Sequence, residues 1–166
     1  MLRQTNGQKW SLKDHITGQD SVSVPYGLST TFVKETKMTA SIDLSTLGHF
    51  TGSEQWFRHW TNAVHYTEGV HYLEQNGAGW LVDAIASYQH EKKLNSGGLR
   101  HFQIWTLEAK DGKAVLTCKA DTGKKPVVTQ NIEFTDFPDG SVDFYVELGS
   151  VDGINESKVL MLVSER

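Results

Sequence analysis

The sequence predicts an α+β domain in which two helices cover one face of a four- to five-stranded antiparallel sheet, with a short preceding hairpin. Three observations support this fold class. Residues 100–166 alternate apolar and polar side chains between turn signals. Residues 67–93 place apolar side chains at helical spacing. The chain has 166 residues, of which 38% are hydrophobic, a composition that excludes a disordered chain, a collagen and a coiled coil.

Composition divides the chain into two parts. Residues 1–43 are polar and rich in Ser, Thr and Gln, and their large apolar side chains are isolated rather than periodic. We expect this part to be an N-terminal extension or a short hairpin of its own. Residues 44–166 are expected to form a single α+β domain, because the periodic patterns lie there.

A hairpin is expected directly before the helices. Residues 55–60 are dense in aromatic side chains, which favour strands, and Thr61-Asn62 can turn the chain into residues 63–66. Thr51-Gly52-Ser53-Glu54 also fits the capping box of a helix, so a helical start remains an alternative for this stretch. The density of aromatic residues favours the hairpin.

Two helices are expected next. Thr67 is a suitable N-cap, Glu68 faces the positive end of the first helix, and Asn76-Gly77 ends it. The second helix is expected over residues 79–93. Its apolar side chains recur on one face, at Trp80, Leu81, Ala84, Ile85 and Tyr88.

The remaining residues predict consecutive antiparallel strands connected as a meander. Residues 102–107 are apolar on both pleat faces, as in a central strand, and Asp111-Gly112 is typical of a two-residue hairpin turn. Further strands are expected over residues 113–119, 128–134, 142–148 and 159–163. A sheet with one apolar face needs a cover, and the two helices are the available candidates.

Charge and cysteine content narrow the function classes. The 16 basic and 20 acidic residues give a formal net charge of −4, which disfavours a broad nucleic-acid surface. The single cysteine, Cys118, has no partner for an internal disulfide, which indicates a reducing compartment. The first residues lack the apolar stretch of a secretory signal, and no apolar run is long enough for a membrane span. We therefore expect a cytoplasmic protein without a membrane partner.

Three segments of the middle zone are distinctive: residues 50–59 (FTGSEQWFRH), 66–73 (YTEGVHYL) and 80–87 (WLVDAIAS). With residues 102–105 and 134–138, they resemble an uncharacterised family of small proteins from bacteria, their phages and other mobile elements. The resemblance covers roughly residues 44–166. It carries no established activity, so no catalytic role is transferred. It implies an accessory protein that acts on host machinery or on a competing defence system.

The candidate binding residues come from the aromatic zone and from the second helix. Trp and Arg are enriched in binding hot spots, and Trp56 and Trp60 share one face whether this stretch is helical or extended. Asp83 is expected to form a partly buried polar network with Arg58 or His59. The alternative is that all these aromatic residues lie in the core. The six candidates are Trp56, Arg58, His59, Trp60, Tyr66 and Asp83.

Catalytic and metal motifs are sparse in the sequence. It contains no paired Cys-x-x-Cys and no His-Glu-x-x-His, and Cys118 falls on the inward face of its strand, where a thiol is inert. A metal site in this sequence would combine one of three histidines with one of two carboxylates: His49, His59 or His65 with Glu54 or Asp83. No cofactor, metal or catalytic residue is predicted.

Three functions are therefore weighed. The favoured one is a non-enzymatic protein that binds and modulates a host or defence protein, as an anti-CRISPR inhibitor does, with a homodimer through an edge strand as a further expectation. The second is a hydrolytic or metal-assisted enzyme that uses Arg58, His59 and Asp83. The third is a nucleic-acid binder that uses aromatic stacking with Arg58 or Arg100, which the net charge disfavours.

Overall fold

The computed structural model describes residues 42–166, which form one compact unit with helices and strands in mixed order. The expected N-terminal extension, apart from its last two residues, lies outside the described residues. Ile42 is buried and Asp43 accepts a hydrogen bond from the Ser45 N–H, so packed structure begins two residues before the expected boundary. The elements are β1 (Phe57–Arg58), β2 (His65–Tyr66), α1 (Glu68–Leu73), α2 (Gly79–Tyr88), α3 (Gly98–His101), β3 (Phe102–Lys110), β4 (Lys113–Lys119), β5 (Val128–Ile132), β6 (Gly140–Gly149) and β7 (Ser157–Leu162).

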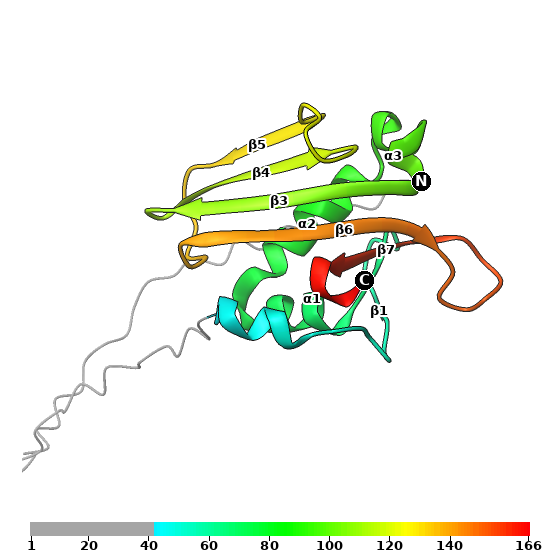
Figure 1. Ribbon diagram of the computed structural model, residues 1–166, viewed down its shortest axis with the longest axis horizontal. Coiled ribbons are helices and arrows are strands. Elements are labelled where there is room, and N and C mark those ends of the chain that lie inside the picture. The colour runs from blue at the N-terminus through cyan, green and yellow to red at the C-terminus, as the bar shows by residue number, and fades with distance from the viewer. Residues whose placement is uncertain (1–41) are drawn as a thin grey trace, which may run out of the picture. The chain divides into compact units, whose positions relative to one another are not determined.

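The sheet has seven strands, not the expected four or five, in the order β1-β2-β7-β6-β3-β4-β5 (Figure 1). The expected hairpin, β1–β2, joins the sheet because β2 pairs in parallel with β7, with Tyr66 opposite Leu160. All other neighbouring strands are antiparallel. The sheet is therefore mixed, which is the first correction to the predicted fold.

The strand order also corrects the meander. β6 pairs with β3 rather than with β5, so the chain crosses the end of the β3–β4 hairpin after β5. In this crossing the Thr135 N–H donates to the Gly112 carbonyl, and Phe137 is buried. The physical reason lies in β3, which is apolar on both pleat faces and takes an interior position between β4 and β6.

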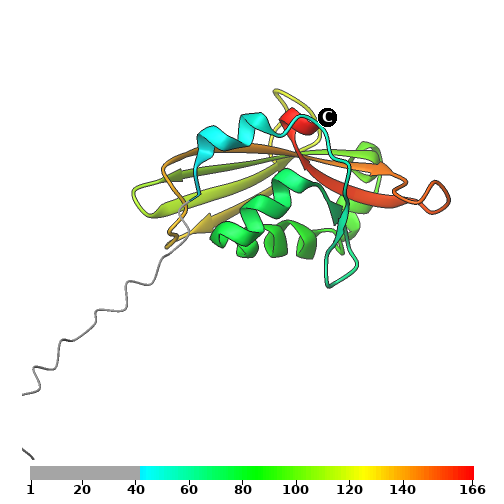
Figure 2. The ribbon, with the colours of Figure 1, turned by 90° about the horizontal axis from the view of Figure 1, so that it is seen from below.

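Two layers form the core, as the sequence predicts. Figure 2 shows α1 and α2 side by side against one face of the sheet. Trp105, Leu116 and Phe144 from the sheet pack there against Leu73 and Ile85 from the helices. The predicted α+β class with helices on one face is therefore confirmed, and the inward face of β4 carries the expected buried residues.

The turn signals are confirmed where they act locally. Asp111 and Gly112 both have positive φ, 53° and 72°, as a type I′ hairpin turn requires. Gly77 has φ 104° and separates α1 from α2 near the expected stop. No helix among residues 42–166 has the length and apolar character needed to cross a membrane.

The start of α1 is capped from outside the helix. Thr67 is the N-cap residue, but its side chain makes no cap bond to the helix and donates instead to Glu165. The Glu68 N–H donates to Ser53 Oγ at 2.7 Å, and the Glu54 N–H donates to the Glu68 carboxylate at 3.2 Å. Residues 51–54 do not start a helix. Ser53 and Glu54 nevertheless complete a reciprocal cap on the helix that begins at Glu68.

The second helix is shorter than expected, because α2 ends at Tyr88 instead of continuing to residue 93. The next side chain, Gln89, turns into the core and bonds reciprocally to Gln103, with 3.0 Å between donor and acceptor in both directions. Asn95 Nδ2 then donates to the Gln89 carbonyl at 2.7 Å and satisfies the end of the helix. A buried polar network, rather than a break in apolar periodicity, therefore ends α2.

Candidate functional site

The β1–β2 hairpin forms one edge of the sheet and carries most of the candidate residues. Phe57 pairs with Tyr66 and Arg58 pairs with His65. The His59 N–H donates to the Val64 carbonyl at 3.0 Å, and Asn62 takes φ 60° in the turn. Asparagine tolerates this left-handed conformation well, so Thr61-Asn62 turns the chain as the sequence predicts.

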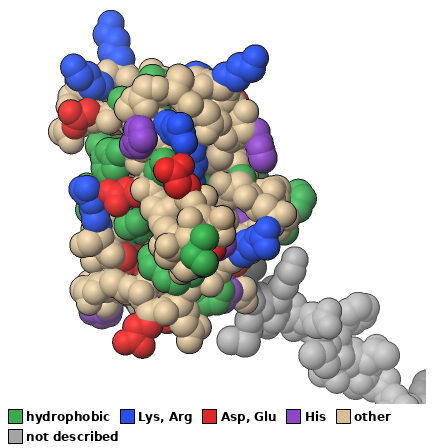
Figure 3. Space-filling view, turned by 90° about the vertical axis from the view of Figure 1, so that its right-hand side faces the viewer, with side chains coloured by type: hydrophobic (Ala, Val, Ile, Leu, Met, Phe, Trp, Pro, Cys, Tyr) green, Lys and Arg blue, Asp and Glu red, His purple; other side chains and the backbone are tan. Residues whose placement is uncertain are grey.

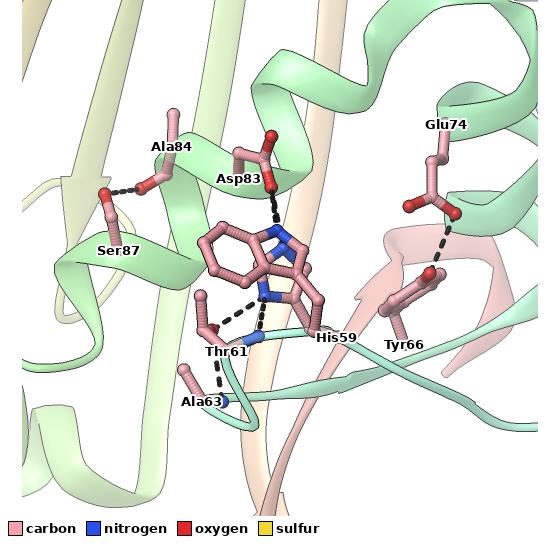
Figure 4. A network of polar contacts seen from close by, with 9 residues as sticks. His59, Thr61, Ala63, Tyr66, Glu74, Asp83, Ala84 and Ser87 are labelled. Carbon is pink, nitrogen blue, oxygen red and sulfur yellow. Dashed lines mark hydrogen bonds and ion pairs between the residues drawn. The ribbon is translucent and has the colours of Figure 1, made fainter.

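His59 is the buried centre of the hairpin, with 2% of its surface exposed. Its Nε2 lies 2.9 Å from Asp83 Oδ1 on α2. Figure 4 shows the His59 ring beside Asp83 and above Thr61. On the other side of the ring, the Thr61 N–H donates to Nδ1 at 3.3 Å. Because Nδ1 accepts this bond, the neutral ring carries its hydrogen on Nε2. The Nε2–H then donates a hydrogen bond to Asp83. Both ring nitrogens are thus engaged within the protein.

Trp60 follows His59 and is exposed over 78% of its surface. Its indole is nevertheless held, because Nε1 donates to Asp83 Oδ1 at 2.8 Å. The indole also lies against the His59 ring, with 5.6 Å between the ring centroids. A large apolar side chain is therefore presented to solvent while its N–H is bonded within the protein.

Asp83 connects the hairpin to α2 and keeps 53% of its side chain exposed. The Trp60 hydrogen bond, with a smaller contribution from His59, holds the pKa of the Asp83 carboxyl below its ordinary value, although partial burial opposes this. The ionised carboxylate is the form that accepts both bonds. The structure brings His59, Trp60 and Asp83 together, as the sequence predicts for His59 and Asp83.

Replacing Asp83 with asparagine is expected to lower the free energy of unfolding by about 1 kcal/mol at pH 7, because the acceptor loses its charge. A depressed folded pKa contributes stability above the unfolded pKa and loses it as pH falls through the folded value. The difference between wild type and Asp83→Asn should therefore shrink below the ordinary aspartate pKa of 3.8. Urea unfolding at neutral and at acidic pH measures this difference, with Glu108→Gln as a control for an exposed carboxylate. An unchanged difference at both pH values would contradict the assignment.

Arg58 does not join this network. Adjacent residues of a strand point to opposite faces, so Arg58 lies on the face away from His59, where it is exposed. The expected alternative pairing of Asp83 with Arg58 is therefore wrong. Trp56, one residue before β1, is 44% exposed.

Tyr66 supports the hairpin from inside and is itself buried. Its hydroxyl donates to Glu74 Oε2 at 2.7 Å. Burial, together with this carboxylate, raises the pKa of the Tyr66 phenol above its ordinary value. The side chain therefore adds no area to the outer surface.

The sequence reasoning missed three contributors, Thr61, His71 and Glu74. Glu74 accepts from Tyr66 and lies 3.0 Å from His71 Nδ1, while the His71 ring stacks on Phe57 with 3.8 Å between centroids. The spacing of His71 and Glu74 at i and i+3 was a readable signal for their pairing. The role of Thr61 depends on the turn geometry, for which the sequence gives no separate signal.

Groups with metal-binding or nucleophilic chemistry are dispersed in the described part of the chain. Of the histidines considered for a metal, His59 bonds to Asp83 and Thr61, whereas His65 bonds to Ser157. Residues 42–166 hold no group of three or more His, Cys, Asp or Glu placed to bind a metal ion. Cys118 is buried, and burial raises the pKa of its thiol to about 12, so the thiol stays protonated and unreactive at neutral pH.

The fold and the hairpin together define a small α+β domain with a tryptophan displayed at one edge of a mixed sheet. The chain belongs to the family of unknown function DUF6876, whose model matches residues 42–166. No curated protein and no solved structure matches this chain. The expectation of an uncharacterised family is therefore confirmed.

Proposed function

We propose that this protein acts by binding another protein through its hairpin surface, defined as the exposed indole of Trp60 at the β1–β2 turn. The observation that carries the proposal is the state of Trp60. Its side chain is 78% exposed, yet its N–H is bonded to Asp83. Most of the indole adds little to the core, while its orientation is fixed before any partner arrives.

Fixed orientation favours binding for a physical reason. A partner that contacts a mobile side chain loses part of the interaction energy to ordering it, at a cost of about 0.5–1.5 kcal/mol per side chain. The contacts of Trp60 with Asp83 and His59 already order its side chain in the free protein, so a partner does not lose this energy on binding. Tryptophan is also among the residue types that dominate measured binding hot spots.

The position of the hairpin suits a protein partner. β1 is an edge strand, so the hairpin surface lies at one side of the sheet, away from the strands that build the core. We propose a host or defence protein in the cytoplasm as the partner, bound stoichiometrically as an anti-CRISPR inhibitor binds its target. The absence of recognised catalytic motifs in the sequence and the resemblance to mobile-element proteins support this class of partner.

The enzymatic alternative is supported by one contact, the 2.9 Å approach of His59 and Asp83. A general base, however, needs a ring nitrogen within reach of the substrate. His59 uses Nε2 for Asp83 and Nδ1 for Thr61, and the ring is buried. We therefore propose that this pair positions Trp60.

The nucleic-acid alternative would need clustered cations. On the face drawn in Figure 3, basic side chains are interspersed with acidic, apolar and histidine side chains. This distribution favours a protein partner over a phosphate backbone.

The proposal is tested by affinity capture from the cell that carries the gene, with wild type, Trp60→Ala and Ile154→Ala as baits. Ile154 is a matched control because it is also an exposed apolar residue, at 86%, and lies outside the hairpin. We expect one protein to be recovered with wild type and with Ile154→Ala, and at least about tenfold less of it with Trp60→Ala, which corresponds to about 1.4 kcal/mol.

Equal recovery with all three baits, or no specific protein with wild type, would refute the proposal. Unfolding curves of Trp60→Ala should remain cooperative, because most of this side chain lies outside the core. A folded Trp60→Ala protein that loses the partner then separates a binding defect from a folding defect.

A further inference from the structure

The opposite edge of the sheet ends in β5, which pairs with β4 alone (Figure 1). Unpaired edges offer free N–H and C=O groups to another strand, and proteins usually protect them with charged residues or proline. The five residues of β5 are Val, Thr, Gln, Asn and Ile, with neither charge nor proline among them. The nearest charges before it are Lys124 and Lys125, which Pro126 and Val127 separate from the strand, and those after it are Glu133, which follows directly, and Asp136.

We propose that β5 pairs with the β5 strand of a second copy of this chain, antiparallel and around a two-fold axis at Gln130. In this register Val128 lies opposite Ile132 of the other copy, and the lysines before the strand lie at the same end as the acidic residues after the strand of the other copy. Because the axis is two-fold, every such contact occurs twice. The charge order of the segment, basic before the strand and acidic after it, is therefore self-complementary in the antiparallel direction.

Two exposed apolar side chains fit the same register. Phe134 is 86% exposed and Val127 is 38% exposed, one at each end of β5. The two-fold arrangement brings Phe134 of one copy beside Pro126 and Val127 of the other. Contact between them removes apolar surface that the isolated protomer leaves in water.

Within one protomer, Glu133 already lies 3.4 Å from Lys113. Both side chains of this pair are exposed, and exposed pairs hold their partners weakly. Glu133 is therefore free to turn toward Lys125 of a second copy. The parallel alternative is disfavoured, because it would place like charges side by side at both ends of the strand.

The dimer leaves the hairpin surface open. β1 and β5 are the two opposite edges of the sheet, so a dimer joined at β5 carries one hairpin surface at each end. Such an assembly presents two copies of Trp60. This consequence is separate from the proposed function, because dimerisation is measured without any partner.

The test is a charge exchange in the full-length chain, followed by sedimentation or light scattering over a hundredfold range of protein concentration. One variant combines Lys124→Glu with Lys125→Glu, and the other combines Glu133→Lys with Asp136→Lys. We expect wild type to dimerise, and each variant alone to dissociate at least about tenfold more readily. An equimolar mixture of the two variants should restore the dimer, because opposite charges then face each other at both ends.

The control is Lys92→Glu with Lys93→Glu, which lowers the net charge as much as the variant with Lys124→Glu and Lys125→Glu but lies in the segment after α2. It should dimerise as wild type does. A monomeric wild type at every concentration, unchanged dimers in both variants, or a mixture that stays monomeric would each overturn the proposal. Raising the salt concentration should weaken the wild-type dimer, because the end contacts are exposed charges.

Discussion

Replacing Gln103 with leucine is expected to lower the free energy of unfolding by about 3 kcal/mol, since a buried donor and a buried acceptor each lose their partner at about 1–3 kcal/mol. Gln103 lies on β3 and is fully buried. Its Oε1 accepts from the Trp105 indole N–H at 2.8 Å, and its Nε2 donates to the Leu99 carbonyl at 2.9 Å. Leucine has a similar volume, so the loss comes from unpaired polar groups rather than from a cavity.

Guanidinium unfolding of Gln103→Leu against wild type measures this loss. Gln75→Leu is the matched control, because Gln75 is exposed, and its effect should stay within about 0.5 kcal/mol. A Gln103→Leu protein as stable as wild type would show that the apolar replacement offsets the broken bonds. The network would then be dispensable for stability.

Lys158 on β7 extends this network. Its ammonium lies among neutral oxygens, 2.9 Å from Gln89 Oε1, 3.1 Å from the Leu94 carbonyl and 2.8 Å from Asn95 Oδ1. Burial lowers the pKa of this group, while three acceptors match the three donors of its charged form. The lysine and the two glutamines thereby hold the segment after α2 against β3 and β7.

Local patterns predicted the parts of the fold that depend on neighbouring residues. The alternation along β4 placed Cys118 inward, and Asp111-Gly112 formed the expected turn. Asn62 turned the hairpin, and Gly77 separated the two helices. Each of these features is decided by the conformational preference or burial of a few adjacent residues.

Contacts between distant segments were not predictable from these patterns. The pairing of Tyr66 with Leu160 joins residues far apart in the sequence, and it turns a separate hairpin into part of a mixed sheet. Ser53 caps a helix that begins at Glu68, although its motif indicated a helix of its own. Gln89 ends α2 through partners on β3 and β7, which periodicity along the helix does not show.

The candidate site divides in the same way. The sequence predicted that Asp83 pairs with either His59 or Arg58, and the structure contains the pair with His59. The alternation of side chains on β1 excludes the pairing with Arg58. The bond from Trp60 to Asp83 depends on where the turn meets α2, so it appears only in three dimensions. This bond is the feature that distinguishes a displayed tryptophan from a core residue left partly exposed.

A close contact between α1 and the end of the chain depends on Gly69. Glu165 is buried beside the first turn of α1, where it accepts from the Gly69 N–H at 2.9 Å and from the Leu162 N–H at 3.0 Å. A methyl group at Gly69 would lie 2.5 Å from Leu162 Cδ1 and 2.8 Å from Glu165 Oε2. Both neighbours are buried, so neither can move aside without disturbing other contacts.

Gly69→Ala is therefore expected to lower the free energy of unfolding by about 2 kcal/mol, because overpacking costs more than the roughly 1 kcal/mol that alanine gains in a helix. Gly79→Ala is the matched control, since its added methyl group would meet no atom closer than 3.7 Å. The control should be unchanged or more stable by up to about 1 kcal/mol. Denaturant unfolding of the two variants isolates the steric term, because both gain the same helix preference. Equal stability of the two would mean that Leu162 and Glu165 withdraw freely, and that the end of the chain is not held against α1 as tightly as these distances require.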